Sequence, residues 1–345
     1  MNMNRISCRE HSFPEKLPAA PLVSVMMITY LHAPYIRQAI ESIVSQQTNF
    51  PFELVIGEDC SPDDTMAIIL ELQKKYPHII RILYSESNVG MNDNAFRTAL
   101  HCRGEYTAFC EGDDFWLDSL KLQKEADYLN AHSDCGLCFG NLALLNNATG
   151  RMKYNTPIPG RLLQPDFRSL FSGNRISTCT AMVRTGLYHQ WLHIQPPVAK
   201  NWLAGDLPLY LYIAALNYKI HGNNEYYACY RVLDNSATHG NLEHKIRFYH
   251  SIAKIKLWFS RNYAKSEYSE QIIFHYAKSI LRIILQEGIY SSKHVSYVKK
   301  LMKHVKTRKR RFLANVYYQS LLFFAEYVPF LFPYLEQSLK MLRRF

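Results

Sequence analysis

The first two thirds of the sequence predict a doubly wound α/β fold. Short apolar runs alternate with segments whose apolar residues recur at helical spacing. The run Leu22–Thr29 is short, apolar and β-branched in part, as a buried parallel strand should be. The predicted strands are residues 22–29, 52–57, 79–84 and 106–110, and the helices between them begin near Pro34, Asp63 and Asn92.

The helix boundaries in this region carry recognisable signals. Pro34 suits the first turn of a helix, because its missing N–H would have no helical partner there. The apolar residues that follow recur at helical spacing: Ile36, Ala39, Ile40 and Ile43. Asp63 and Asp64 precede a second helix, which should end before Pro77.

From about residue 135 the pattern becomes mixed and richer in strands. The elements predicted here are strands at 135–145, 177–184 and 226–232, with a helix at 207–216. Beyond residue 240 apolar residues return to helical spacing. The predicted organisation is a leader at 1–20, an α/β domain at 21–240 and a basic helical C-terminal region at 241–345.

The net charge of +11 comes entirely from the last third of the chain. Residues 1–239 hold 20 Lys/Arg and 23 Asp/Glu, a balance of −3. Residues 240–345 hold 20 and 6, a balance of +14. The two regions therefore differ in electrostatics, and we expect them to differ in role.

The basic region combines charge with apolar character. Eight Lys/Arg fall in residues 299–311, just before the apolar stretches 321–324 and 330–332. Such clusters are attracted to an anionic membrane surface, and each basic residue near that surface contributes about 1 kcal/mol of binding free energy. We expect residues 299–335 to bind that surface; a solvated helix face with ordinary core is the alternative. No nucleic acid partner is expected, because no recognition module accompanies the charge.

The chain shows no signal for export or membrane insertion. Its N-terminus lacks an apolar signal region, and its eight cysteines are scattered. No stretch reaches the ~18 uncharged apolar residues that span a bilayer. These features predict a cytoplasmic protein that is peripheral on the cytoplasmic face of the membrane.

Acidic residues stand at the predicted carboxyl edge of the sheet. Glu58 and Asp59 end the second strand, Asp113 and Asp114 follow the fourth, and Asp206 precedes a helix. Ligands of open α/β sheets bind outside the carboxyl ends of the strands. Adjacent carboxylates there can hold Mg²⁺ or Mn²⁺ and leave positions for diphosphate oxygens. The alternative for each of the last three aspartates is a helix N-cap.

Four motifs together resemble the family 2 glycosyltransferases of the GT-A fold. In the family's order over residues 21–235 they are PLVSV leading to Thr29-Tyr30, Glu58-Asp59 followed by SPDDT, Asn88-Val89-Gly90, and EGDDFW from Glu111. The resemblance implies a GT-A-like Rossmann-type domain and an inverting, hexosyltransferase-type enzyme with a nucleoside-diphosphate sugar donor, uridine being the expected base. It also implies a glycan or polyprenyl-linked acceptor in cell-surface polysaccharide, O-antigen or lipid-linked glycan synthesis.

The resemblance assigns roles on the donor side. Thr29 and Tyr30 would border the nucleoside, and Asp59 would bond the base or the ribose. Asp113 and Asp114 stand in the place of the family's D-x-D motif. Asp114 would bind the metal directly, and Asp113 would lie nearer the ribose.

Three further residues receive roles in the same way. Arg97, on the helix before the metal-binding strand, would meet a phosphate or else be a solvated helix charge. His239 would add a metal or phosphate contact or else be an ordinary loop residue. Asp206 corresponds to the general base, although many relatives carry Glu-Asp where this chain has Gly205-Asp206. It would take the acceptor proton as the oxygen attacks.

Two other functions are alternatives to this one. Sugar-phosphate nucleotidyltransferases share the sheet and the metal, but they resemble one another in a Gly-rich basic loop after the first strand. Residues 29–34 (TYLHAP) contain neither Gly nor Lys/Arg. A non-catalytic, membrane-associated scaffold with the same fold is the second alternative, and the intact set of carboxylates argues against it.

Overall fold

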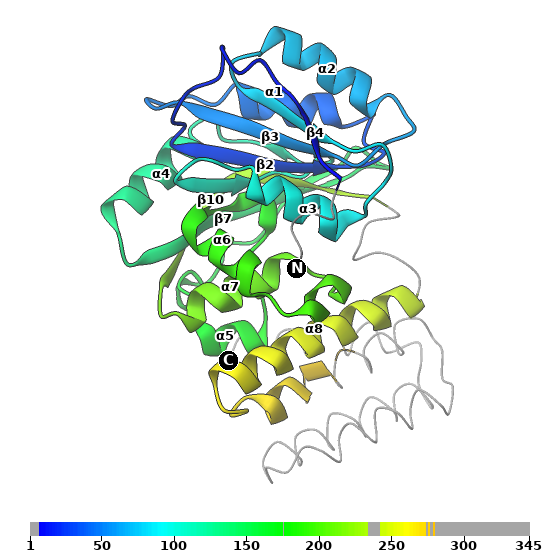
Figure 1. The fold of residues 1–345 in the computed structure, drawn as a ribbon. Helices are drawn as coiled ribbons and strands as arrows, with labels where there is room; N and C mark the ends of the chain where they lie inside the picture. Colours follow the sequence, from blue (N-terminus) through cyan, green and yellow to red (C-terminus); the bar gives the residue numbers. More distant parts are fainter. Residues whose placement is uncertain (1–6, 175, 234–241, 274, 277–278, 280–345) are drawn as a thin grey trace. The chain divides into compact units, whose positions relative to one another are not determined.

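The computed structural model describes residues 7–174, 176–233, 242–273, 275–276 and 279 (Figure 1). The chain forms two compact units, Met1–Leu233 and Asp234–Phe345. The first unit contains the whole described sheet and every predicted site residue except His239.

The sheet is built around parallel strands. β2 (Val23–Thr29) lies between β3 (Phe52–Glu58) and β5 (Tyr106–Phe109), and β4 (Ile80–Tyr84) lies beyond β3. β3 is buried along its whole length, including Glu53, whose carboxylate is paired with Arg81 and Arg103. The predicted α/β fold class is confirmed.

Antiparallel strands extend this parallel core on both sides. β1 (Arg9–His11) pairs with β4, so the predicted leader contains the edge strand of the sheet. On the other side, β9 (Ala181–Arg184) joins β5 to β7 (Cys135–Asn146) and runs antiparallel to both. The sheet is therefore mixed.

The far part of the sheet is dominated by two long strands. β10 (Lys219–Val232) runs parallel to β7, and it begins well before the predicted residue 226. The short β6 (Phe115–Trp116) pairs antiparallel with β10, and β8 (Met152–Tyr154) pairs with β7. The order along the sheet is β1-β4-β3-β2-β5-β9-β7-β10-β6.

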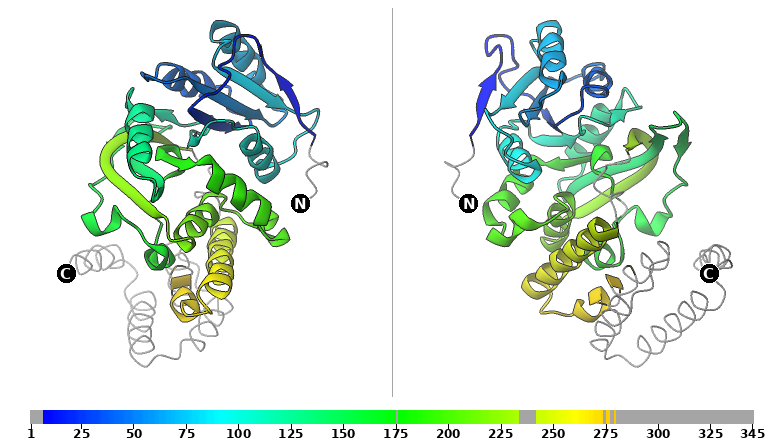
Figure 2. Two further views of the ribbon diagram at one scale, coloured as in Figure 1. Left: turned by 60° about the vertical axis from the view of Figure 1, so that its left-hand side comes forward. Right: turned by 90° about the vertical axis from the view of Figure 1, so that its right-hand side faces the viewer.

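Helices cover both faces of the sheet (Figures 1 and 2). α1 (Ile36–Val44), α2 (Thr65–Lys75) and α4 (Lys121–Ala131) contribute to one hydrophobic core with the strands. α3 (Met91–Leu100), α6 (Thr185–Ile194) and α7 (Asp206–Ala215) pack in series on the opposite face, and α5 (Phe167–Ser172) packs on α7. Three short 3₁₀ turns complete the unit: Gly160–Leu162, Thr178–Thr180 and Pro197–Asn201.

The first helix shows why the sequence pattern was informative. The four apolar residues expected on one face of α1, Ile36, Ala39, Ile40 and Ile43, are all fully buried. Burying such a stripe removes each side chain from water, and each large aliphatic group thereby stabilises the fold by about 1.5–3 kcal/mol. Helix α1 is thereby fixed against the strands that carry the candidate site.

The second unit contains α8 (Leu242–Tyr263), whose Ile255 and Phe259 are fully buried. Among the described residues, no helix combines the length and the apolar composition needed to cross a membrane. The predicted membrane-binding segment, residues 299–335, lies outside the described residues.

Candidate active site

Two loops meet at the end of β2. The backbone N–H of Asp59 donates to the carbonyl of Thr29 across 3.1 Å. On the other side of β2, the N–H of Gly112 donates to the carbonyl of Ile28, also across 3.1 Å. Asp59 and the Glu111–Asp114 loop therefore flank the carboxyl end of β2, as the rule for open α/β sheets predicts.

The loop after β2 is held by polar side chains before and at the start of α2. The backbone N–H groups of three consecutive residues donate to them: Leu31 to Ser61 Oγ (3.1 Å), His32 to Thr65 Oγ1 (3.0 Å) and Ala33 to Asp63 Oδ2 (3.1 Å). Thr29 is buried, whereas the Tyr30 side chain lies beside it with 40% of its surface exposed. An exposed aromatic ring at this edge is available for stacking, which suits the predicted contact of Tyr30 with a nucleoside.

The Asp59 side chain orders the loop after β4. Its carboxylate oxygens accept the backbone N–H groups of Val89 (2.8 Å) and Gly90 (3.0 Å). Gly90 has φ 87°, a left-handed conformation that glycine adopts without strain. The role of Asp59 toward a base or ribose stays a prediction; in the protein alone it shapes the loop that would border such a ligand.

Arg97 occupies a different environment from the one its sequence position suggested. It is only 2% exposed, so the alternative of a solvated helix charge is wrong. Its guanidinium donates to the carbonyls of Ser7 (2.9 Å) and Glu58 (2.7 Å) and lies 3.9 Å from Asp59. A phosphate contact would require this buried group to leave its partners. Its position supports a structural role beneath Asp59 and lends no support to the predicted phosphate contact.

The Glu111–Asp114 loop carries carboxyl groups of different accessibility. The Asp113 side chain is 21% exposed, and its Oδ2 lies 4.0 Å from Nε2 of His32. Asp114 is 2% exposed, and its Oδ1 accepts the backbone N–H of Arg231 across 2.8 Å. Burial, with the nearby charges of Asp113 and Glu111, raises the pKa of Asp114 well above its usual range. The predicted preference for Asp114 as the direct metal ligand is thus unsupported by position, which favours Asp113.

The helix-cap alternative fails for this loop. Asp113 and Asp114 lead into Phe115 and Trp116, which form strand β6. Helix α4 begins later, at Lys121, with Leu120 at the N-cap position. Neither aspartate caps a helix, so their carboxylates are not explained by first-turn amides.

Glu111 is a member of the acidic group that sequence reasoning left without a role. Its Oε2 is buried and has no hydrogen-bond partner among the described residues. Burial, followed by the charges of Asp113 and Asp206, raises the pKa of Glu111 to about 7. The sequence signal that could have assigned Glu111 to the site was its position two residues before Asp113. The orphaned oxygen and the raised proton affinity suit a group awaiting a cation or a ligand donor.

Asp206 lies on the same side of the sheet edge as Glu111. It is the first residue of α7, after Gly205 at the N-cap position, and its carboxylate bonds backbone N–H groups of the first turn, so the predicted alternative of a helix-capping role stays open. Asn174 Nδ2 donates to its Oδ2 at 3.5 Å. Burial raises the pKa of Asp206, while its bond to a backbone N–H of α7 and to Thr178 opposes that rise. The charge of Asp206 is close enough to raise the pKa of Glu111, which links α7 to the acidic loop.

The residues present fit a divalent cation that shares its ligands with a substrate. Within the described ranges, no three His, Cys, Asp or Glu side chains converge as a metal centre. Mg²⁺, however, is commonly held by one or two carboxylates together with substrate phosphates and water. The exposed oxygens of Asp113 and the unpartnered Oε2 of Glu111 match that requirement. His239, the third predicted ligand, lies outside the described residues.

Comparison with known proteins identifies the segment that carries this edge. The family model described as glycosyl transferase family 2 matches residues 24–190. The matched segment is just under half of the chain. It contains β2, β3 and the Glu111–Asp114 loop, and it ends before Asp206.

Curated relatives match the chain over different lengths. An uncharacterised protein of Mycobacterium tuberculosis is 40% identical over 117 residues, which is 34% of each chain. The chain therefore spans about a third of the length of this relative and of two equally similar mycobacterial proteins. The putative teichuronic acid biosynthesis glycosyltransferase TuaG of Bacillus subtilis is 27% identical over 219 residues, 63% of this chain and 81% of TuaG.

Solved structures support the fold of the chain. Residues 1–349 of Staphylococcus aureus TarS, crystallised with UDP-GlcNAc, superpose with a TM-score of 0.58 and 17% identity, over 87% of each chain. At that identity the likeness shows the fold alone. It confirms the GT-A-type arrangement predicted from the four motifs.

Proposed function

We propose that this protein transfers a hexose from a UDP-sugar to a hydroxyl group of a glycan or polyprenyl-linked acceptor in cell-surface polysaccharide synthesis. The name of TuaG, a putative teichuronic acid enzyme, and the TarS complex with UDP-GlcNAc support this donor and this kind of product. The observation that carries the proposal is the meeting of Thr29, Asp59 and the Glu111–Asp114 loop at one edge of the sheet.

The donor would lie across the end of β2. The exposed ring of Tyr30 and the loop ordered by Asp59 form two sides of a nucleoside site. Mn²⁺ or Mg²⁺, held by Asp113 with Glu111 or Asp114 beside it, would neutralise the diphosphate as it leaves. Arg231 donates hydrogen bonds to the Asp114 side chain and to the Asp113 carbonyl, and these bonds hold the loop with its carboxyl groups in place before the donor binds.

Asp206 is the proposed general base. Its carboxylate takes the proton of the acceptor hydroxyl, whose oxygen forms a bond to the anomeric carbon. The bond from that carbon to the diphosphate breaks on the opposite face, and the nucleoside diphosphate leaves with its electron pair. A raised pKa makes Asp206 a better proton acceptor than an ordinary aspartate once it is ionised.

Donor binding tests the proposal directly. We expect UDP with Mn²⁺ to raise the melting temperature of the full chain, because ligand at 100 times its Kd stabilises by about 2.7 kcal/mol. Asp113→Ala should abolish the shift, whereas Asp127→Ala, an exposed change on α4, should preserve it. The absence of any nucleotide-dependent shift would count against the proposal. Release of pyrophosphate from UTP and a sugar 1-phosphate would favour a nucleotidyltransferase instead.

Transfer and membrane binding need separate tests. A nucleotide-sugar screen should show donor hydrolysis or transfer that depends on Mn²⁺ or Mg²⁺; a scaffold would show neither. Sedimentation with vesicles of anionic lipid should recover the full chain at low salt and release it at high salt. Neutral vesicles provide the control, and equal binding to both would contradict the proposed role of residues 299–335.

A further inference from the structure

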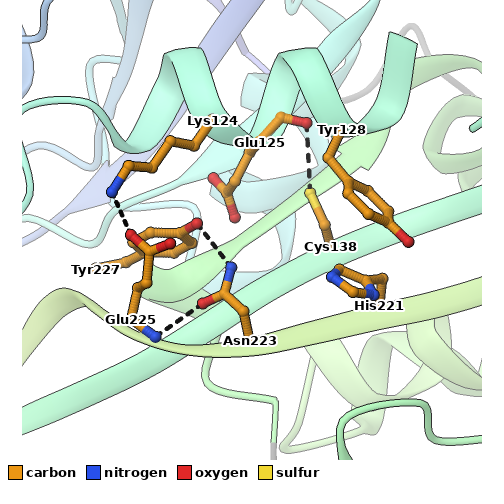
Figure 3. A pocket seen from close by; sticks show the side chains of 8 residues that line it. All are labelled: Lys124, Glu125, Tyr128, Cys138, His221, Asn223, Glu225 and Tyr227. Atoms are coloured by element: carbon orange, nitrogen blue, oxygen red, sulfur yellow. Dashed lines mark hydrogen bonds and ion pairs between the residues drawn. The ribbon is translucent and has the colours of Figure 1, made fainter. Parts of the chain in front are cut away.

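A second pocket lies between α4 and the first half of β10, apart from the acidic edge (Figure 3). Its volume is about 270 Å³, just below the ~300 Å³ at which small-molecule sites begin. Its walls come from α4, β7 and β10 and include Lys124, Glu125, Tyr128, His221, Asn223 and Tyr227. None of these residues belongs to the candidate active site.

Two buried polar atoms at this pocket have no hydrogen-bond partner among the described residues. One is Oε1 of Glu125, a side chain only 2% exposed, and the other is Nδ1 of His221. The second oxygen of Glu125 accepts from Lys121 Nζ at 2.5 Å, so only one side of the carboxyl is satisfied. A buried polar atom left unpaired destabilises the fold, and a hydrogen bond to a ligand hydroxyl would remove that cost.

Aromatic rings hold this polar pair in place. The His221 ring stacks on Tyr128 with centroids 3.9 Å apart, and His132 also stacks on Tyr128, at 4.1 Å. Tyr227 accepts a hydrogen bond from Asn223 Nδ2 at 2.8 Å, and its ring faces Lys121. The pocket therefore presents fixed rings beside hydrogen-bonding atoms.

The lysines and carboxylates at the pocket are engaged with one another. Lys121 pairs with Glu125, and Lys124 pairs with both Glu225 and Asp118. An anionic or cationic ligand would find its opposite charge already engaged. A neutral molecule with several hydroxyl groups and an apolar face suits the two unpaired atoms, the ring walls and these paired charges.

We infer that this pocket binds one neutral sugar unit of the acceptor glycan, away from the site of transfer. The inference rests on the proposed function in taking the acceptor to be a glycan. Tyr227 and Arg231 lie four residues apart on the same side of β10, so at ~3.3 Å per residue the pocket lies roughly 13 Å along the strand from the acidic loop. A chain of sugars could occupy both places at once, which would retain the growing glycan between transfers.

Saturation-transfer NMR on the full chain tests this inference with neutral monosaccharides and disaccharides as probes. We expect signals from at least one probe, undiminished by excess UDP with Mn²⁺. His221→Phe keeps the ring stack but removes Nδ1, and it should weaken binding about tenfold. The matched control is His132→Phe, which changes the other ring stacked on Tyr128 and leaves the pocket lining intact.

A second variant tests whether His221→Phe weakens binding merely by disturbing the fold. Glu125→Gln keeps the shape of the side chain and should also weaken sugar binding, while circular dichroism shows a folded chain. In transfer assays, His221→Phe should raise KM for a glycan acceptor and leave the KM for the donor unchanged.

The outcomes separate this inference from the proposed function. Sugar binding that is lost in His221→Phe but retained in Asp206→Asn supports the pocket, even if no donor is ever turned over. Signals displaced by UDP, signals lost equally in His132→Phe, or no sugar signal in the unaltered chain would overturn it. Transfer activity without any of these pocket effects would leave the proposed function standing alone.

Discussion

The backbone N–H of Arg231 donates to Oδ1 of Asp114 across 2.8 Å, although 117 residues separate the two along the chain. The Arg231 side chain continues the contact: its Nε donates to the carbonyl of Asp113 at 2.9 Å, and its guanidinium lies 4.7 Å from the Tyr35 ring centroid. Strand β10 thus fastens the acidic loop to the sheet and to the segment before α1. The loop is ordered before any ligand binds.

Two Asp114 variants should separate the contribution of its hydrogen bond to Arg231 from the contribution of its negative charge. Asp114→Ala leaves the N–H of Arg231 unpaired, and we expect a loss of about 1–3 kcal/mol in the free energy of unfolding. Asp114→Asn retains an acceptor oxygen and removes one of several crowded negative charges, so its stability should equal or exceed that of the unaltered chain. Urea unfolding measures both. Equal losses in the two variants would show that the charge of Asp114, and not its hydrogen bond, holds the loop.

Asp206→Asn should remove catalysis without removing the donor site. Loss of a general base lowers the rate by about 10²–10⁴, so transfer should fall by that factor while the thermal shift with UDP and Mn²⁺ persists. Asp127→Asn, an exposed aspartate on α4, is the matched control and should leave the rate unchanged. If Asp206→Asn transferred sugar at the unaltered rate, another residue would have to serve as the base.

The edge of the sheet was predictable because burial leaves a local trace. β2 and β3 are buried along most of their length, so their sequences are mainly apolar apart from Ser24 and Glu53, which bond each other, and the polar residues that follow mark the strand ends. The topology rule then places Asp59 and Asp113 at one edge without any distance information. The identity of each element and the order of the parallel strands could be argued on that basis.

Long-range partners leave no such trace. Arg97 sits on a helix with polar neighbours, and nothing local reveals that the carbonyls of Ser7 and Glu58 surround its guanidinium. The pocket at Glu125 and His221 was invisible for the same reason, since its walls come from α4, β7 and β10. Such sites depend on pairing between distant strands, which the periodicity of a single sequence does not encode.

Arg97→Lys tests whether this arginine supports the fold or binds a phosphate. The lysine keeps the charge but donates from a single nitrogen, so it cannot reach the separate acceptors that Nε and the two terminal nitrogens of Arg97 bond. We expect a loss of about 1–3 kcal/mol in the free energy of unfolding, measured by urea titration. A raised KM for the donor with unchanged stability would instead restore the predicted phosphate contact.

The edge strand β1 should make stability depend on pH. Arg81 bonds both carboxylate oxygens of Glu10, at 2.9 and 2.8 Å, and this bond lowers the pKa of Glu10. A carboxyl whose folded pKa lies below its unfolded value of about 4.3 stabilises the fold above that value, and this contribution disappears as pH falls through the folded pKa.

Glu10→Gln should therefore lower the free energy of unfolding by about 1 kcal/mol at pH 7, because the pair is partly exposed. The difference from the unaltered chain should shrink below about pH 4. Glu86→Gln breaks the exposed pair with Arg9 and is expected to change little at any pH. A deficit for Glu10→Gln that stayed constant down to pH 3 would assign its contribution to packing.

Gly112 allows β2 and the acidic loop to touch. A β-carbon at this position would lie 2.6 Å from Oγ1 of Thr29 and 2.8 Å from Nδ1 of His32, both closer than real contacts allow. The hydroxyl of Thr29 and Nδ1 of His32 are themselves hydrogen-bonded at 3.2 Å, so neither can move without breaking that bond. Only a residue without a side chain permits this approach.

Gly112→Ala should consequently push the loop that carries Asp113 away from β2. We expect a loss of about 1–3 kcal/mol in stability and a weaker thermal shift with UDP and Mn²⁺, because the donor site loses its geometry. Gly186→Ala is the matched control: a β-carbon there meets nothing within 4 Å, and alanine is the better helix former in α6. If Gly112→Ala bound UDP as tightly as Gly186→Ala, the close approach of this loop to β2 would have no part in holding the donor.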